Sequence, residues 1–239
     1  SRHNIIGNIK KGQQLWLEAK KVIAGGNMLF SKRPDAFLPD AWPSYFKSTK
    51  GCQVIDLDNK KYFDMCNMSV GTNTLGYSNK FVDSAVNKVI KNGNMSSLNC
   101  PEEVFLAKKL IKLHPWADRV RFARTGGEAN AVAIRLARAS TLKKNIAFCG
   151  YHGWHDWYLA ANIKSKNNLS EHLLKGLKVD GVPKLLKKTI YPFMYNDYKT
   201  LEKIVKNHNI GIIKMEVIRY DMPKNNFLKK VRELADAKG

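Results

Sequence analysis

Two adjacent glycines stand where a short apolar segment meets a helical pattern. The stretch from Arg121 to Asn130 reads R-F-A-R-T-G-G-E-A-N. Val120 to Ala123 is expected to end a buried strand, and apolar residues then recur with helical spacing at positions 129, 132, 133, 136 and 137. Gly126 and Gly127 would therefore lie at a helix N-terminus, where backbone N–H groups and the helix dipole favour an anion. The turn is predicted to hold a phosphate group.

A second group of chemically capable side chains follows the next predicted strand. Ile146 to Cys149 should form that strand, and residues 151–157 after it read Y-H-G-W-H-D-W. With the segment before Gly126 and the helix between, it would complete a β-α-β unit with a right-handed crossover. Parallel strands bring their carboxyl ends to one edge of a sheet, where such sheets bind ligands. The glycine turn and the aromatic and imidazole cluster should therefore face the same edge.

Other catalytic arrangements find less support. His155 and Asp156 are neighbours in sequence, which does not indicate a catalytic dyad, and no nucleophile elbow accompanies them. The glycine- and threonine-rich loop from Met68 to Tyr77 has glycines at nucleotide-loop spacing, but no Lys-Ser/Thr pair follows, which excludes a Walker motif. The four cysteines have no C-x-x-C spacing, which argues against a zinc site and fits reduced thiols in a cytosol.

Composition sets wider bounds. The chain has 239 residues and a formal net charge of +21, with 44% apolar residues. Lysine and arginine are scattered through every predicted helix, and no nucleic-acid-binding signature accompanies them. This favours a lysine-rich solvated surface over a specific nucleic-acid site, although nonspecific polyanion binding would be unsurprising. No apolar run approaches a membrane span and no signal-peptide core is visible, so a globular protein without membrane segments is expected. The chain begins at Ser1, not at a methionine, and we expect a fragment or a processed form.

The remaining pattern alternates strands with helices. A helix from Lys10 to Ala24 and a hairpin turned at Asp58-Asn59 open the chain, and Ala160 to Val182 is a polar excursion. The other predicted elements are helices at 81–91, 102–113, 199–207 and 225–238 and strands at 53–57, 61–65, 189–193 and 210–217. This alternation predicts a doubly wound α/β domain.

The succession of motifs resembles a known family. T-G-G-E-A-N followed by F-C-G-Y-H-G-W-H-D is similar to the class III aminotransferases of the fold type I pyridoxal-phosphate enzymes, and most similar to their glutamate-1-semialdehyde aminomutase-like branch. Further matches occur in the family's order at residues 25–26, 51–58, 62–64, 75–77 and 195–197. The resemblance implies a large, mainly parallel sheet domain from residues 67–239, part of a small α+β lobe from residues 1–66, and a missing C-terminal part. It also implies a cytoplasmic enzyme that is a homodimer when full length.

The resemblance assigns cofactor contacts to particular residues. The backbone of Gly126 and Gly127 would hold the phosphate of pyridoxal 5'-phosphate, with the Thr125 hydroxyl beside it, although Gly127 lacks the hydroxyl of the family's usual threonine. Tyr151 matches the aromatic residue that stacks on the cofactor ring, the alternative being an ordinary core tyrosine. His152 would be a hydrogen-bonded neighbour of the site.

Two carboxylates and two missing groups complete this assignment. Glu128 would either cap the helix or reach the cofactor region. Glu216 matches the glutamate of the family's E-P motif, with Val217 in place of the proline, and should support the site from behind. The aspartate that pairs with the pyridine nitrogen and the Schiff-base lysine are both expected beyond Gly239, because no lysine of the chain has the sequence context of the family's lysine.

Three functions therefore stay open. The first is transamination of an amino acid, amine or amino-sugar-type substrate. The second is glutamate-1-semialdehyde aminomutase activity, which is less favoured because Ser69-Val70 replaces an aromatic pocket residue and because Y-H-G-W-H-D-W-Y departs from the aminomutase's Y-H-G-H-A-D. The third is a truncated, non-catalytic protein that keeps the fold.

Overall fold

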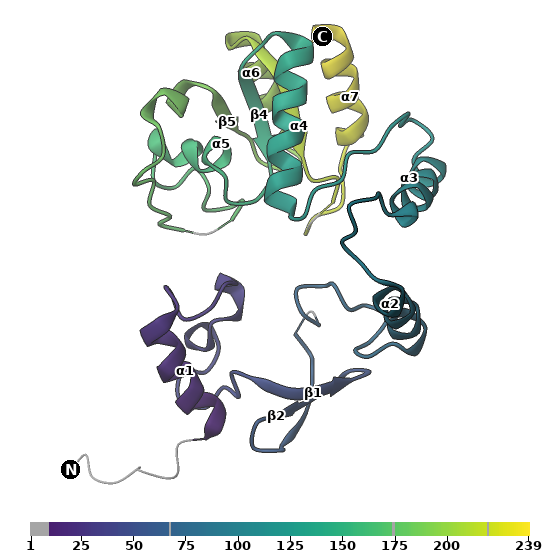
Figure 1. The fold of residues 1–239 in the computed structure, drawn as a ribbon. Coiled ribbons are helices and arrows are strands. Elements are labelled where there is room, and N and C mark those ends of the chain that lie inside the picture. Colours follow the sequence, from purple (N-terminus) through teal and green to yellow (C-terminus); the bar gives the residue numbers. More distant parts are fainter. Residues whose placement is uncertain (1–9, 67, 174, 219) are drawn as a thin grey trace, which may run out of the picture. The chain divides into compact units, whose positions relative to one another are not determined.

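The computed structural model of the chain describes residues 10–239 apart from 67, 174 and 219. It divides into two compact units, within Ser1–Phe105 and Leu106–Gly239 (Figure 1). The lobe boundary expected between residues 66 and 67 concerns the complete family fold and stays a prediction.

The first unit contains a helix and a small antiparallel sheet. Helix α1 spans Lys11–Val22, and strands β1 (Phe46–Lys50), β2 (Gln53–Asp56) and β3 (Lys61–Phe63) pair in the order β1-β2-β3. The predicted helix and hairpin are thus confirmed. Buried Asp56 fixes the hairpin turn, because its Oδ1 accepts from the backbone N–H groups of Asp58 (2.9 Å) and Lys60 (2.8 Å). Strand β1 was not predicted, since its polar sequence, F-K-S-T-K, has no apolar alternation.

Two amphipathic helices follow, as predicted. Helix α2 spans Lys80–Asn92 and helix α3 spans Pro101–Leu113. The Asn79 side chain caps α2 by accepting from the N–H groups of Phe81 (3.1 Å) and Val82 (3.3 Å). Neither helix contains a buried residue. Their apolar sides therefore remain open in the described part of the chain.

The second unit is built on a parallel sheet. Strands β4 (Asn145–Cys149), β5 (Ile190–Pro192) and β6 (Ile210–Met215) lie in the order β5-β4-β6. Helices α4 (Gly126–Thr141), α5 (Asp156–Leu159), α6 (Tyr198–Asn207) and α7 (Phe227–Lys238) surround it (Figure 1). Apart from α5, these elements match the predicted strands and helices to within a few residues at each end.

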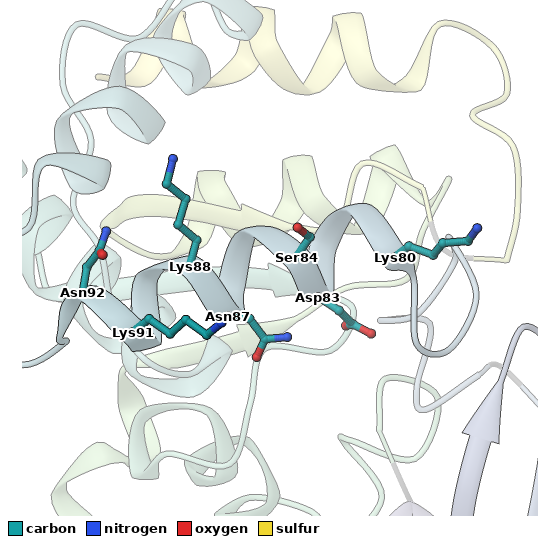
Figure 2. A pocket seen from close by; sticks show the side chains of 7 residues that line it. All are labelled: Lys80, Asp83, Ser84, Asn87, Lys88, Lys91 and Asn92. Carbon is teal, nitrogen blue, oxygen red and sulfur yellow. The ribbon is translucent and has the colours of Figure 1, made fainter.

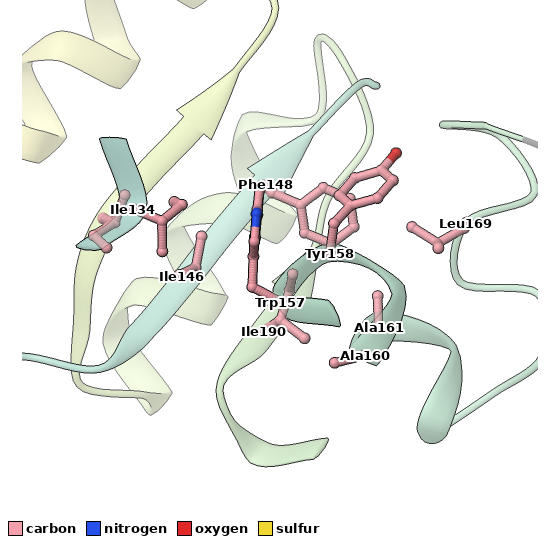
Figure 3. Close-up of a cluster of buried hydrophobic side chains, with 10 residues drawn as sticks. Ile134, Ile146, Phe148, Trp157, Tyr158, Ala160, Ala161, Leu169 and Ile190 are labelled. Atoms are coloured by element: carbon pink, nitrogen blue, oxygen red, sulfur yellow. The ribbon is translucent and has the colours of Figure 1, made fainter. Parts of the chain in front are cut away.

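Helices cover both faces of this sheet. Ile146 and Phe148 of β4 pack with Ile134 of α4 and with the α5 region on one face (Figure 3). The alternate residues of β4, Ala147 and Cys149, pack on the other face against α6 and α7. Because successive strand residues point to opposite faces, a strand buried on both sides must be apolar throughout. The apolar residues 146–149 of β4 therefore account for the packing of helices on both faces, which is the doubly wound arrangement.

One predicted strand does not form. Val120 to Ala123 has no strand conformation, and Phe122 is 42% exposed. A strand requires a neighbouring ladder to satisfy its backbone, and no described segment pairs with these residues. The β-α-β unit predicted around Gly126 is therefore wrong in its first strand. Helix α4 is instead preceded by a segment without regular structure.

The polar excursion from 160 to 182 begins with a short 3-10 helix (Ala160–Ile163), and its other described residues have no regular structure beyond turns and bends. It also contributes to the core. Ala160, Ala161 and Leu169 are buried against the sheet face that carries α4. Asn162 is also buried, and its Oδ1 accepts from the N–H of Leu169 at 2.9 Å. This segment therefore closes one side of the second unit's core.

Candidate functional site

The start of helix α4 is fixed by hydrogen bonds to the side chains of Thr125 and Glu128. The Thr125 Oγ1 accepts from the N–H of Glu128 at 3.1 Å, and the Glu128 Oε2 accepts from the N–H of Arg124 at 2.9 Å. This arrangement is similar to the capping box of a T-x-x-E sequence, but the Glu128 carboxylate accepts from the residue before the N-cap residue Thr125. It gives Glu128 a capping role, the first of the two alternatives drawn from the sequence.

The cap leaves two amides of α4 for another partner. Gly126 and Gly127 are the first residues of a 16-residue helix, and the first N–H groups of a helix have no intrahelical acceptor. Within the described residues, neither amide donates to a protein acceptor. A Cβ built on Gly126 meets nothing within 4 Å. The helix start is thus an open cradle with the polarity that an anion requires.

The turn after β4 is held by contacts from distant parts of the chain. Gly150 donates its N–H to Nδ1 of buried His172 (3.0 Å) and accepts from the Tyr158 hydroxyl (2.7 Å). Tyr151 donates its N–H to Oε2 of Glu216 at 3.1 Å. Gly150 has φ +95°, and a Cβ there would collide with the Glu216 carboxylate. Glu216 therefore fixes the backbone from which the Tyr151 ring projects.

Tyr151 and His152 have different surroundings. The Tyr151 side chain is 37% exposed and touches Tyr158 edge to face, with ring centroids 6.5 Å apart. His152 is only 2% exposed, donates from Nε2 to the Cys149 carbonyl at 2.8 Å and stacks on Trp157. The Tyr151 ring is therefore partly exposed after the end of β4, whereas the His152 ring is buried.

The cluster after β4 reaches the start of α4. A Cβ on Gly153 would lie 2.8 Å from the Cα of Gly127, so the two backbones are in contact. A Cβ on Gly127 would lie 3.0 Å from both Cδ2 and Nε2 of His155. The structure thus brings together Thr125, the glycine pair and the 150–155 loop, as expected for the carboxyl edge of a parallel sheet.

Sequence reasoning did not select His155 or His172 as members of this site. His155 belongs to the Y-H-G-W-H-D-W cluster expected at this edge, but the sequence assigns it no role of its own apart from the unsupported dyad with Asp156. His172 lies in the irregular segment, where neither periodicity nor a motif marks it. Both are placed by the tertiary fold, which a single sequence does not reveal.

A half-buried lysine lies close to the Glu216 carboxylate. Lys214 and Glu216 are two residues apart at the end of β6, so their side chains leave the same face of the sheet. Burial lowers the pKa of Lys214, and the negative charge of Glu216 partly offsets this effect. The lysine is therefore easier to deprotonate than an exposed one.

Two shallow hollows mark the described surface. One, of about 460 Å³, is lined by His155, Asp156 and Trp157, beside the α4 cradle. The other, of about 590 Å³, follows the polar side of α2, where Figure 2 shows lysines, amides and one carboxylate. The α2 hollow is a solvated helix surface without a convergent group of polar side chains. No helix among the described residues is long and apolar enough to cross a bilayer.

The fold is shared with solved structures. The chain superposes on a transaminase with pyridoxal phosphate bound at a TM-score of 0.82 and 23% identity, covering 97% of this chain and 54% of the other. An omega-transaminase from Sphaerobacter thermophilus gives a TM-score of 0.81 at 21% identity, covering 98% of this chain and 54% of the other. The architecture is that of fold type I pyridoxal-phosphate-dependent transaminases.

The chain belongs to the class-III aminotransferase family, whose model matches residues 40–239. It is 35% identical to 3-aminobutyryl-CoA aminotransferase of Cloacimonas acidaminovorans, over 95% of this chain and 53% of the relative. It is 33% identical to glutamate-1-semialdehyde 2,1-aminomutase of Methanobrevibacter smithii, over 94% of this chain and 52% of the relative. The family resemblance inferred from the motifs is confirmed. The chain spans about half the length of these relatives.

The family's cofactor is pyridoxal 5'-phosphate, and the residues present fit two parts of it. The open cradle at Gly126 suits the phosphate, and the exposed ring of Tyr151 offers a flat surface for the pyridine ring.

Proposed function

We propose that this chain is the N-terminal half of an enzyme that transaminates an amino acid, amine or amino-sugar-type substrate with pyridoxal 5'-phosphate. The observation that carries the proposal is the meeting of the α4 cradle with the loop that bears Tyr151 at one sheet edge. The chain can thus bind two parts of this cofactor: its phosphate at the α4 cradle and its pyridine ring beside Tyr151.

Each residue then has a defined task. The N–H groups of Gly126 and Gly127 bind the phosphate, and Thr125, whose oxygen already accepts from Glu128, keeps its hydroxyl hydrogen to donate. Tyr151 stacks on the ring, Glu216 fixes the tyrosine's backbone, and His152 supports the turn from behind. When bound, the cofactor draws electrons from the carbon next to the substrate nitrogen. We propose that the Schiff-base lysine and the aspartate for the pyridine nitrogen lie outside residues 1–239.

We also propose that the full-length protein is a cytoplasmic homodimer that acts on a small molecule. The support comes from helices α2 and α3, which contain no buried residue. Phe81 is 87% exposed and Phe105 is 64% exposed, and apolar surface of this kind is normally covered by other parts of a protein or by a partner. Cys52, Cys66 and Cys100 form no disulfide within the described residues, which fits a reducing compartment.

The proposed activity is tested with the full-length protein and pyridoxal 5'-phosphate. Amine donors, with 3-aminobutyryl-CoA included because a relative is named for it, are supplied with a keto-acid acceptor, and both products are measured. Transfer of the amino group from donor to acceptor is the expected result. Cofactor binding without transfer from any donor contradicts the proposal and supports the non-catalytic alternative.

Aminomutase activity is the second candidate, supported by relatives of that name at 33% identity. An aminomutase retains its amino group between half-reactions and needs no external donor. Efficient conversion of glutamate-1-semialdehyde without an added amine would favour this candidate over a transaminase. Conversion that depends on an added donor would favour the transaminase.

A further inference from the structure

The space beside Gly127 is filled by an imidazole ring. A Cβ at this position would lie 3.0 Å from two atoms of the His155 ring, Cδ2 and Nε2, and 3.8 Å from the Thr125 Oγ1. The ring therefore occupies the room into which a side chain at residue 127 would extend. Residue 127 is also where the sequence departs from the family's usual threonine.

The position of His155 is set by buried neighbours. His155 is the N-cap residue of α5, and its carbonyl accepts from the N–H groups of Tyr158 (3.0 Å) and Leu159 (3.1 Å). Tyr158 is fully buried and Trp157 is 7% exposed, so the segment after His155 is anchored in the core. Gly153, with φ +93°, lets the preceding backbone pass against Gly127. The backbone of His155 is thus anchored, and its ring lies at the start of α4.

The imidazole has hydrogen-bonding capacity to spare. The His155 side chain is exposed, and no described residue forms a hydrogen bond with either ring nitrogen. A neutral imidazole has one donor nitrogen, and a protonated one has two. Its Nε2 faces the same space as the Thr125 hydroxyl, beside the two open amides.

We propose that His155 is a phosphate-binding residue that donates from Nε2 to the cofactor phosphate, in place of the hydroxyl that Gly127 lacks. This inference rests on the proposed function, because it concerns the same cofactor site. A hydrogen bond to an ionised phosphate is stronger than one between neutral groups, so one donor at this place can replace the missing hydroxyl. The chain then keeps a side-chain donor at the cradle by moving it from the helix to the loop after β4.

The phosphate contact is tested by comparing two ligands that differ only in the phosphate. Dissociation constants of the full-length protein for pyridoxal 5'-phosphate and for pyridoxal are measured by calorimetry. H155A should weaken binding of the phosphorylated ligand by roughly tenfold and leave pyridoxal unchanged. H155Q, whose amide can donate near Nε2, should lose less. H208A, which removes an exposed imidazole elsewhere in the second unit, is the control and should change neither constant.

A second pair of variants tests whether a donor at residue 127 of the helix can replace the donor at His155 of the loop. G127T alone should not strengthen binding, because the new Cβ meets the His155 ring at 3.0 Å. In the H155A background that ring is absent, and G127T should recover most of the lost preference for the phosphorylated ligand. The expected pattern is that G127T strengthens binding of the phosphorylated ligand in the H155A background but not in the wild type.

Two results would overturn the role of His155. One is an unchanged preference for the phosphorylated ligand in H155A. The other is an equal loss for both ligands, which would mean that the ring only packs against the loop. Failure of the proposed function looks different. If the chain holds no cofactor site, the wild-type protein shows no preference for the phosphorylated ligand, and if the site is present without catalysis, the preference remains but no amino group is transferred.

Discussion

Gly153 lies directly against Gly127, so close that a Cβ on the first would approach the Cα of the second to 2.8 Å. The contact joins the loop after β4 to the start of α4, the two parts of the proposed cofactor site. There is no room for a side chain between them. The spacing of the phosphate cradle from the Tyr151 loop is therefore set by two backbones.

Replacing Gly153 with alanine should damage both stability and cofactor binding. The residue has φ +93°, and the added methyl group would also press on the Gly127 backbone. Gly181→Ala is the matched control, because Gly181 has φ +86° and a Cβ there meets nothing within 4 Å. The control should lower the free energy of unfolding by about 1 to 2 kcal/mol from conformational strain alone. G153A should lower it by about 2 to 4 kcal/mol, since overpacking adds to strain.

Urea unfolding measures these two losses, and calorimetry measures cofactor affinity. Only G153A should weaken binding of pyridoxal 5'-phosphate. Equal losses of stability in the two variants, with affinity unchanged in both, would show that the contact between the loop and the helix does not shape the site.

Most helices and strands could be predicted from the sequence because local apolar periodicity and capping residues determine them. Helices α2, α4 and α6 follow apolar spacing and capping residues such as Asn79. The strand predicted at Val120 to Ala123 does not form, because local sequence does not determine strand pairing. An apolar run predicts a strand only if a partner strand exists, and pairing is a property of the whole fold. The polar strand β1 is the converse case, since pairing with β2 forms it without an apolar pattern.

Truncating Tyr151 tests the stacking role. Tyr151→Ala should weaken binding of pyridoxal 5'-phosphate by about 1 to 2 kcal/mol, or roughly five- to thirtyfold, which is the scale of an aromatic contact. Tyr151→Phe keeps the ring and should bind almost as well as the wild type. If phenylalanine is as harmful as alanine in the binding measurement, the hydroxyl matters more than the ring and the stacking role is wrong.

The candidate site was predictable where its residues belong to motifs. Thr125, Gly126 and Gly127 were placed by the chemistry of a helix N-terminus, which holds although the strand predicted before it does not form. Tyr151 was placed by the end of β4 in a parallel sheet. His155 and His172 were not predictable in this way. His172 reaches Gly150 across 22 residues through an irregular segment, and His155 meets Gly127 only because Gly153 allows the backbones to touch. Contacts of this kind depend on tertiary packing.

Lys214 should give the protein a pH-dependent stability in the alkaline range. Its pKa in the folded state lies below the ordinary value of 10.5, mainly because burial disfavours the charged form. The unfolded chain therefore binds more protons between the two pKa values, and stability rises with pH across that window. Lys214→Met removes the titrating group and should flatten this rise. It should also be at least as stable as the wild type at neutral pH.

The measurement is urea unfolding of wild type and K214M at a series of pH values from neutral to about pH 10, near the ordinary pKa of lysine. The difference in unfolding free energy between the two proteins isolates Lys214 from the other titrating groups. A difference that does not change with pH would show that the lysine titrates alike in the folded and unfolded states.

The last prediction concerns the lysine that the family uses for covalent attachment. The resemblance assigns it to a position beyond Gly239, so residues 1–239 should not react with pyridoxal 5'-phosphate at a single site. The chain carries 41 lysine and arginine residues together, and exposed lysines react weakly and without preference. Borohydride reduction followed by mass spectrometry should therefore find diffuse labelling or none. The full-length protein is the control, and one lysine outside this chain should carry its label. A chain of residues 1–239 that is stoichiometrically labelled at one lysine would show that the attachment site lies within it, and the proposed division of the site would then be wrong.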